Sequence, residues 1–199
     1  SASKTKRYTV WPALKMPGCA SISIDVSVHF TGISISQIRP SFKSGLSPLP
    51  GSSEAQKAIT EIMQQVLAPP PLRATRQAPE SYLTVAGVVT RTNAQRAKYG
   101  LPPLRQNTKL SSAASAKVAD MFAQQYFAHE SPSGQSASDL AKNAGYAYII
   151  IGENLALGNY ANDTELVQAW MDSPGHRANI LHERFQEIGV AVKRGTFEG

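Results

Sequence analysis

Apolar and polar residues alternate along residues 21–38, and the phase of the alternation flips once. The flip falls at Thr31-Gly32, where a two-residue turn would keep all apolar side chains on one face. The pattern therefore predicts a β-hairpin, and a bulge at Gly32 within a strand is the alternative. The apolar positions are Ile22, Ile24, Val26, Val28, Phe30, Ile33 and Ile35.

A helical stripe follows the hairpin. Ser53 and Gln56 have the spacing of a capping box, and apolar residues then recur at helical spacing until Pro69 stops the helix. The stripe consists of Ile59, Ile62, Met63, Val66 and Leu67. We therefore expect a hairpin-plus-helix segment over residues 1–68 and a stiff, proline-rich linker over residues 69–79. So small a segment has little core, so we expect it to pack on the rest of the chain, on another copy or on a protein partner.

The remaining residues, 80–199, alternate between helical and strand signals. Cap and stop residues predict helices from about Ser81 to Tyr99, from Asn107 or Thr108 onward, from Ser136 to Gly145, and from Asn162 to Trp170. Apolar runs at residues 148–151 and 188–192 have the length of strands. Helices that flank a short antiparallel sheet make this part α+β.

Composition narrows the class of protein. The apolar share of 42% supports a buried core, and the net charge of +6 favours acidic surfaces. Basic residues do not interleave with aromatic ones, so we expect no nucleic-acid partner. No apolar run reaches the roughly 18 residues of a transmembrane segment. Cys19 is the single cysteine, so no intramolecular disulfide can form.

Three short strings carry the candidate chemistry. They are His129-Glu130-Ser131-Pro132, Gly152-Glu153-Asn154, and Trp170-Met171-Asp172-Ser173-Pro174-Gly175-His176-Arg177. Glu153 follows a buried strand, where an unpaired carboxylate would cost several kcal/mol, so we expect an imidazole to pair with it. The strings predict a polar site of two imidazoles and a carboxylate, able to hold a divalent metal or orient a water. Trp170 is expected in the core, and Asn154 is expected to tie loops together.

These strings, together with the run from Asn93 to Leu104 and Glu187-Ile188-Gly189-Val190, resemble the bacterial, SCP-like branch of the CAP superfamily. The superfamily comprises cysteine-rich secretory proteins, antigen 5 and pathogenesis-related 1. The resemblance begins near Leu83 and does not extend to residues 1–80. It implies a CAP-like α-β-α sandwich over residues 80–199. Family members usually continue into one more edge strand, so a truncated C terminus is expected.

The resemblance also implies site residues. His129 and His176 fall where the family places its two histidines, and Glu153 at its first glutamate. The family's second glutamate is replaced here by Ser173, and Asp172 and Glu165 are the nearby candidates for a fourth ligand or a supporting role. Two imidazoles and a carboxylate suit zinc, and the loss of a carboxylate makes the expected binding weak.

The resemblance favours a bacterial, secreted or cell-envelope protein. We expect a binding module for a small ligand, a lipid or a cell-wall component, with a His/Glu cleft that holds a divalent metal weakly. The alternative is a metal-dependent or His/Glu-dependent, peptidase-like hydrolase, with His129, Glu153 and His176 as candidate catalytic residues. A third reading makes the cluster a polar clip between loops.

Overall fold

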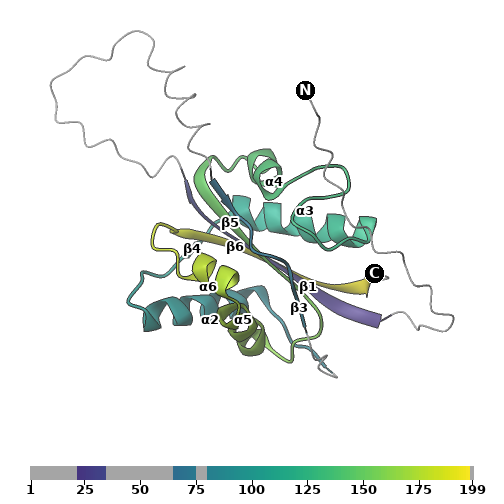
Figure 1. The fold of residues 1–199 in the computed structure, drawn as a ribbon, viewed down its shortest axis with the longest axis horizontal. Helices are drawn as coiled ribbons and strands as arrows, with labels where there is room; N and C mark the ends of the chain where they lie inside the picture. The colour runs from purple at the N-terminus through teal and green to yellow at the C-terminus, as the bar shows by residue number, and fades with distance from the viewer. Residues whose placement is uncertain (1–21, 35–64, 75–79, 198–199) are drawn as a thin grey trace, which may run out of the picture.

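The computed structural model describes residues 22–34, 65–74 and 80–197. A mixed sheet lies between two layers of helices, with α3 and α4 on one face and α2, α5 and α6 on the other (Figure 1). The strands are β1 (Ile22–Ser34), β2 (Gln65–Leu67), β3 (Leu72–Arg73), β4 (Arg105–Gln106), β5 (Tyr148–Leu157) and β6 (Glu187–Phe197). The helices are α2 (Val85–Lys98), α3 (Thr108–Gln124), α4 (Ala137–Asn143), α5 (Asp163–Asp172) and α6 (Pro174–Ile180). The α+β prediction is confirmed.

The first strand, β1, is continuous and lies in the middle of the sheet. The strand order is β2-β5-β1-β6-β4, with β3 paired to β5 beside this path. β1 is antiparallel to both neighbours, and Gly32 pairs with Ile151 on one side and with Glu187 on the other. The predicted hairpin is therefore wrong. Strands β5 and β6, which lie far from β1 in the sequence, supply backbone hydrogen-bond partners on both sides of β1. The chain therefore does not need to fold back on itself.

The phase flip in β1 comes from neither a turn nor a bulge at Gly32. The ladder is regular through Ile33 with β5 and through Gly32 with β6, and the register shift lies further on, between Ile33 and Ser34. Phe30 belongs to one core cluster, and Ile33 packs against the other. The bulge alternative is therefore also wrong, and the apolar positions change face because apolar clusters cover both faces of the sheet.

The end of the predicted N-terminal helix is also wrong. Gln65–Leu67 forms strand β2, parallel to β5, while residues 35–64 lie outside the described part of the chain. Proline disfavours a helical backbone at the residue before it, which here is Ala68. The open edge of β5 then offers hydrogen-bonding groups that an extended segment can use.

Part of the predicted N-terminal unit thus belongs to the same sheet as the C-terminal half. The independent folding of residues 80–199 stays a prediction. Within the described residues, no helix has the length and apolar character to cross a membrane.

Helix caps account for the boundaries in the C-terminal half. Helix α2 begins after Thr84, whose side chain accepts a hydrogen bond of 2.9 Å from the backbone N–H of Gly87, so it starts later than predicted. Gly100 has a φ of 70° just past the end of α2, as expected for a left-handed cap. Asn107 caps α3, and the predicted capping box of Ser136 opens α4.

A buried arginine fixes the end of α6 against α2. Arg96 has no exposed surface, and its guanidinium donates hydrogen bonds to backbone carbonyls. The accepting carbonyls belong to Pro102, Ile180, His182 and Phe185. These bonds anchor the C-terminal end of α6, the helix that carries His176. Trp170 of α5 is fully buried in the core cluster that also contains Val88 and Ile180, as predicted.

Candidate functional site

Glu153 and His129 form a pair between the sheet and the loop that follows α3. Glu153 lies in β5 opposite Phe30 and has no exposed surface. His129 Nδ1 lies 2.5 Å from Glu153 Oε2. The expected imidazole partner of the buried carboxylate is therefore present. The other carboxylate oxygen, Oε1, is buried without a hydrogen-bond partner among the described residues.

The second histidine is held by the start of α6. Pro174 occupies the first turn of this helix, and His176 is 1% exposed. Its Nδ1 atom shares a hydrogen bond of 2.8 Å with Ser173 Oγ, while Nε2 is buried and has no partner among the described residues. Burial lowers the pKa of His176 to about 4, and the nearby His129 contributes to the shift. His176 is thus neutral near pH 7 and presents one unused ring nitrogen.

Two asparagines join β5 to α6. Asn154 Nδ2 donates to the His176 carbonyl at 3.1 Å, and Asn179 Nδ2 donates to Asn154 Oδ1 at 2.9 Å. The tying role predicted for Asn154 is confirmed. Asn179 is buried within this network, whereas Arg177 is exposed and bonds to Tyr99. The network places Glu153 and His176 on adjoining elements.

Lys117 is a buried cation that the sequence reasoning missed. Its Nζ atom donates to the His129 carbonyl at 2.7 Å and contacts Tyr126 Oη at 3.1 Å. Burial lowers the pKa of the Lys117 ammonium, and the charge of Glu153 opposes that shift. The sequence signal of its burial was its position in the apolar stripe of α3, three residues after Ala114 and four before Met121.

Pro69 also reaches the site, from the segment between β2 and β3. His129 Nε2 donates a hydrogen bond to the Pro69 carbonyl oxygen. The proline ring lies against Gly175 at the start of α6, where an added Cβ would come within 2.5 Å of Pro69 Cβ. No local sequence signal could have shown this contact, because Pro69 and His129 lie 60 residues apart in the chain.

Comparison with known proteins agrees with this architecture. Residues 89–198 match the sequence model of the cysteine-rich secretory protein family, CAP. The chain belongs to the CAP family. A crystal structure of an extracellular protein containing an SCP domain, from Bacillus anthracis str. Ames, shares the fold with a TM-score of 0.51. The two chains are 25% identical, over 57% of this chain and 40% of that one.

Two proteins of Bacillus subtilis (strain 168) are similar to the CAP region. The uncharacterized protein YkwD is 46% identical over 110 residues, which cover 55% of this chain and 42% of YkwD. The uncharacterized membrane protein YlbC is 32% identical over 103 residues, which cover 52% of this chain and 30% of YlbC. The chain therefore matches less than half the length of either relative.

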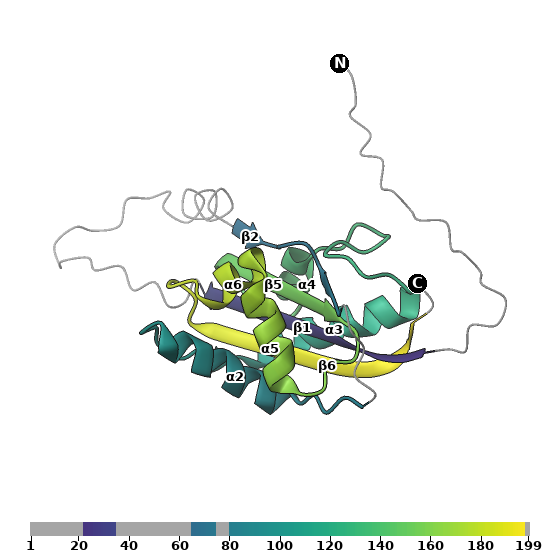
Figure 2. The ribbon, with the colours of Figure 1, turned by 60° about the horizontal axis from the view of Figure 1, so that its bottom comes forward.

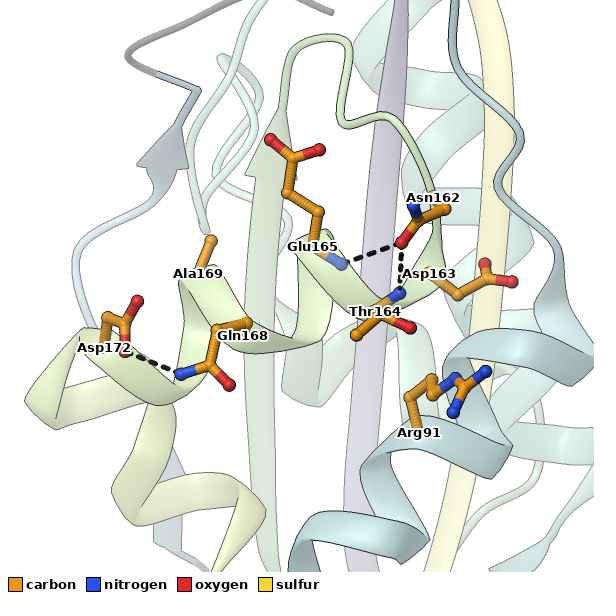
Figure 3. Close-up of a pocket in the computed structure, with 8 residues that line it drawn as sticks. All are labelled: Arg91, Asn162, Asp163, Thr164, Glu165, Gln168, Ala169 and Asp172. Carbon is orange, nitrogen blue, oxygen red and sulfur yellow. Dashed lines mark hydrogen bonds between the residues drawn. The ribbon is translucent and has the colours of Figure 1, made fainter.

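Ser173, Asp172 and Glu165, the residues considered for the position of the family's second glutamate, lie in two different places. Ser173 contacts His176, as described above. Asp172 and Glu165 instead line a hollow of about 770 Å³ on the outer side of α5, together with Arg91 of α2 (Figure 3). Asp172 accepts a hydrogen bond from Gln168, and Glu165 accepts one from the backbone of Ala161. The structure therefore does not bring these two carboxylates to the His129–Glu153 pair.

The donor set of the CAP site does not form a metal site in this arrangement. Among the residues that the structure describes, no group of three or more His, Cys, Asp or Glu side chains could hold a metal ion. Both ring nitrogens of His129 already have partners, because Nδ1 contacts Glu153 and Nε2 donates to the Pro69 carbonyl. Zinc binding by His129, Glu153 and His176 stays a prediction, and it requires that Pro69 move away.

Proposed function

We propose that this CAP domain is an extracellular binding module for a component of the bacterial cell envelope. The observation that carries the proposal is the pair of buried, unpartnered polar atoms, Glu153 Oε1 and His176 Nε2. Buried polar atoms without partners are rare in folded proteins, so such atoms in a shared polar cluster point to a ligand. The ligand would supply a donor to the carboxylate and a donor or an acceptor to the imidazole.

The surroundings of the cluster argue against a serine hydrolase. A serine hydrolase needs a nucleophile, a base and an acid in one connected chain. Here Ser173 contacts His176, whereas the carboxylate of Glu153 contacts His129. The carboxylate and the serine therefore contact different histidines, and these contacts do not form one nucleophile–base–acid chain. The lowered pKa of His176 also makes it a weak base toward Ser173.

Two further facts support the envelope as the place of action. The net charge of +6 suits the anionic polymers and lipids of a cell envelope. The Bacillus anthracis protein of the same fold is described as extracellular.

Co-sedimentation with insoluble peptidoglycan and with anionic phospholipid vesicles tests the proposal. We expect the purified chain to sediment with one of the two materials and His176→Ala to reduce the bound fraction at least fivefold. Arg177→Ala is the matched control, since Arg177 is exposed on the same helix. Circular dichroism checks that both variants keep the fold.

Two outcomes would count against the proposal. One is binding that is identical in the wild type and in His176→Ala. The other is turnover of general peptide or ester substrates that is lost in both His129→Ala and His176→Ala, which would favour the hydrolase.

A further inference from the structure

Residues 65–74, called the strap below, lie along the outer edge of β5 (Figure 2). β2 pairs in parallel with residues 150–152, and β3 pairs in parallel with residues 156–157. The backbone N–H of Ala74 extends this second ladder by donating to the Leu157 carbonyl at 2.9 Å. Between the two ladders, the sequence Ala-Pro-Pro-Pro passes the part of β5 that carries Glu153.

Two side chains of the site bind the backbone of the strap. Asn179 Nδ2 donates to the Leu67 carbonyl at 3.0 Å, and His129 Nε2 donates to the Pro69 carbonyl. A carbonyl oxygen only accepts, so both nitrogens act as donors. Every peptide offers such carbonyls. These contacts therefore recognise an extended backbone rather than the side chains of this particular segment.

The proline triplet fits the gap between the ladders. A proline has no N–H to donate, so it suits a stretch of edge strand that makes no ladder bonds. The ring of Pro69 lies against Gly175, where an added Cβ would approach Pro69 Cβ to 2.5 Å. Gly175 thus leaves a seat for a proline ring at the start of α6.

The strap is held at the surface. None of its ten side chains is buried, and Val66 is 41% exposed. In contrast, all ten residues of β5 are buried. The strap is therefore held by its two short ladders and by the half-buried Leu67, Leu72 and Ala74, which pack against the core cluster on this side of the sheet. Departure of the strap would open a strand edge. An open edge is a ready template for another extended segment.

We propose that this edge is a groove for an extended, proline-containing peptide, and that the strap is its tethered occupant. The peptide runs parallel to β5, places a proline against Gly175 and offers that residue's carbonyl to His129. Strand addition of this kind takes its affinity from backbone hydrogen bonds and its specificity from side-chain seats. The inference rests on the proposed binding function and specifies a ligand class for the same site.

Tethering favours the strap over a free peptide, because its effective concentration at the groove is high. A peptide supplied in trans should therefore bind the wild type weakly and bind an opened variant better. The opened variant is the full chain with Leu67→Ser, Pro69→Ser and Leu72→Ser, which weakens the strap and leaves the groove unchanged.

The probe is a fluorescein-labelled peptide with the sequence of residues 65–74, and the readout is fluorescence polarisation. We expect the opened variant to bind this peptide at least tenfold more tightly than the wild type. Adding Gly175→Val to the opened variant should weaken binding at least tenfold, because the new side chain fills the proline seat. Ala178→Val, an exposed position on the same helix, is the matched control and should leave binding unchanged.

Equal binding by the opened variant and the wild type would overturn the inference, as would binding that survives Gly175→Val. Sedimentation with peptidoglycan or vesicles by the wild type, without peptide binding by the opened variant, would leave the proposed function standing and remove the peptide groove.

A second measurement uses the wild type alone, in case the opened variant fails to fold. Hydrogen exchange should show the Ala74 amide exchanging at least a hundredfold faster than the amides in the middle of β1, because the strap detaches without global unfolding. Equal exchange rates would mean that the strap leaves only when the whole domain unfolds, and would overturn the inference.

Discussion

His129 Nδ1 lies 2.5 Å from Glu153 Oε2, and this contact joins the loop after α3 to a strand that is buried along its whole length. The carboxylate would otherwise be buried with neither of its oxygens paired. His129 therefore stabilises the fold independently of any ligand, and a loss of binding in a His129 variant has to be separated from a loss of stability.

Removing the imidazole should destabilise the domain strongly. His129→Leu leaves the buried Glu153 carboxylate without a hydrogen-bond partner, and the charge of Lys117 offsets only part of this loss, so we expect the free energy of unfolding to fall by about 3 kcal/mol. The double variant His129→Leu, Glu153→Leu removes both partners and should recover most of this loss. Urea denaturation measures both values. An equal loss in the single and double variants would show that packing, rather than the unpaired charge, determines the effect.

Local signals in the sequence were enough to predict the caps and the first contact of the site. The helix caps at Asn107, Ser136 and Asn162 each depend on residues within one helical turn. The pairing of Glu153 followed from the cost of burying a carboxylate, together with the position that the family resemblance gave to His129.

Long-range pairing could not be predicted in the same way. The alternation in β1 fits an edge hairpin and a central strand equally well, and only the distant strands β5 and β6 decide between them. The helical stripe that ends at Leu67 likewise gave no sign of the β5 edge that binds it. The position of Pro69 at His129 is a consequence of that pairing and was therefore missed as well.

The buried imidazole of His176 should make stability depend on pH. Its pKa is lowered from 6.5 to about 4 in the folded state, so between these values the unfolded chain binds more protons than the folded one. Stability should therefore fall as the pH drops from 6.5 toward 4, by up to about 3 kcal/mol, and this contribution should level off below pH 4. Urea denaturation at several pH values, in the presence of a chelator, measures the slope.

The control for this prediction is His176→Gln, which does not titrate in this range. The variant should lack the part of the slope that His176 contributes, while other groups that titrate in the same range keep theirs. If the wild type and His176→Gln lose stability in parallel between pH 6.5 and 4, the imidazole of His176 is not the group responsible.

A glycine on β6 allows the sheet to approach α3. A Cβ added at Gly189 would lie 2.2 Å from the backbone carbon of Leu110, which cannot move without shifting the helix. We expect Gly189→Ala to lower the free energy of unfolding by about 2 kcal/mol or more. Gly195→Ala is a suitable comparison, because its Cβ would meet the ring of Phe122, a side chain that can rotate away. A smaller loss for Gly189 than for Gly195 would contradict this account.

Truncation of the chain tests the predicted division into two folding units at the proline-rich segment. A linker over residues 69–79 would let a chain that starts at Pro79 fold alone. The sheet order predicts the opposite, because β1 separates β5 from β6 and is hydrogen-bonded to both. Without β1, each of these strands loses a whole edge of backbone partners and the sheet loses its middle.

We therefore expect the chain that starts at Pro79 to lose its cooperative thermal transition, followed by circular dichroism. Removal of residues 1–20 leaves β1 intact and is the control, which should retain the transition. A peptide of residues 22–34 added to the shorter chain should restore it, since that peptide supplies the missing strand. A cooperative transition in the shorter chain without the peptide would mean that β5 and β6 can close the sheet on their own, and that the two-unit division is correct.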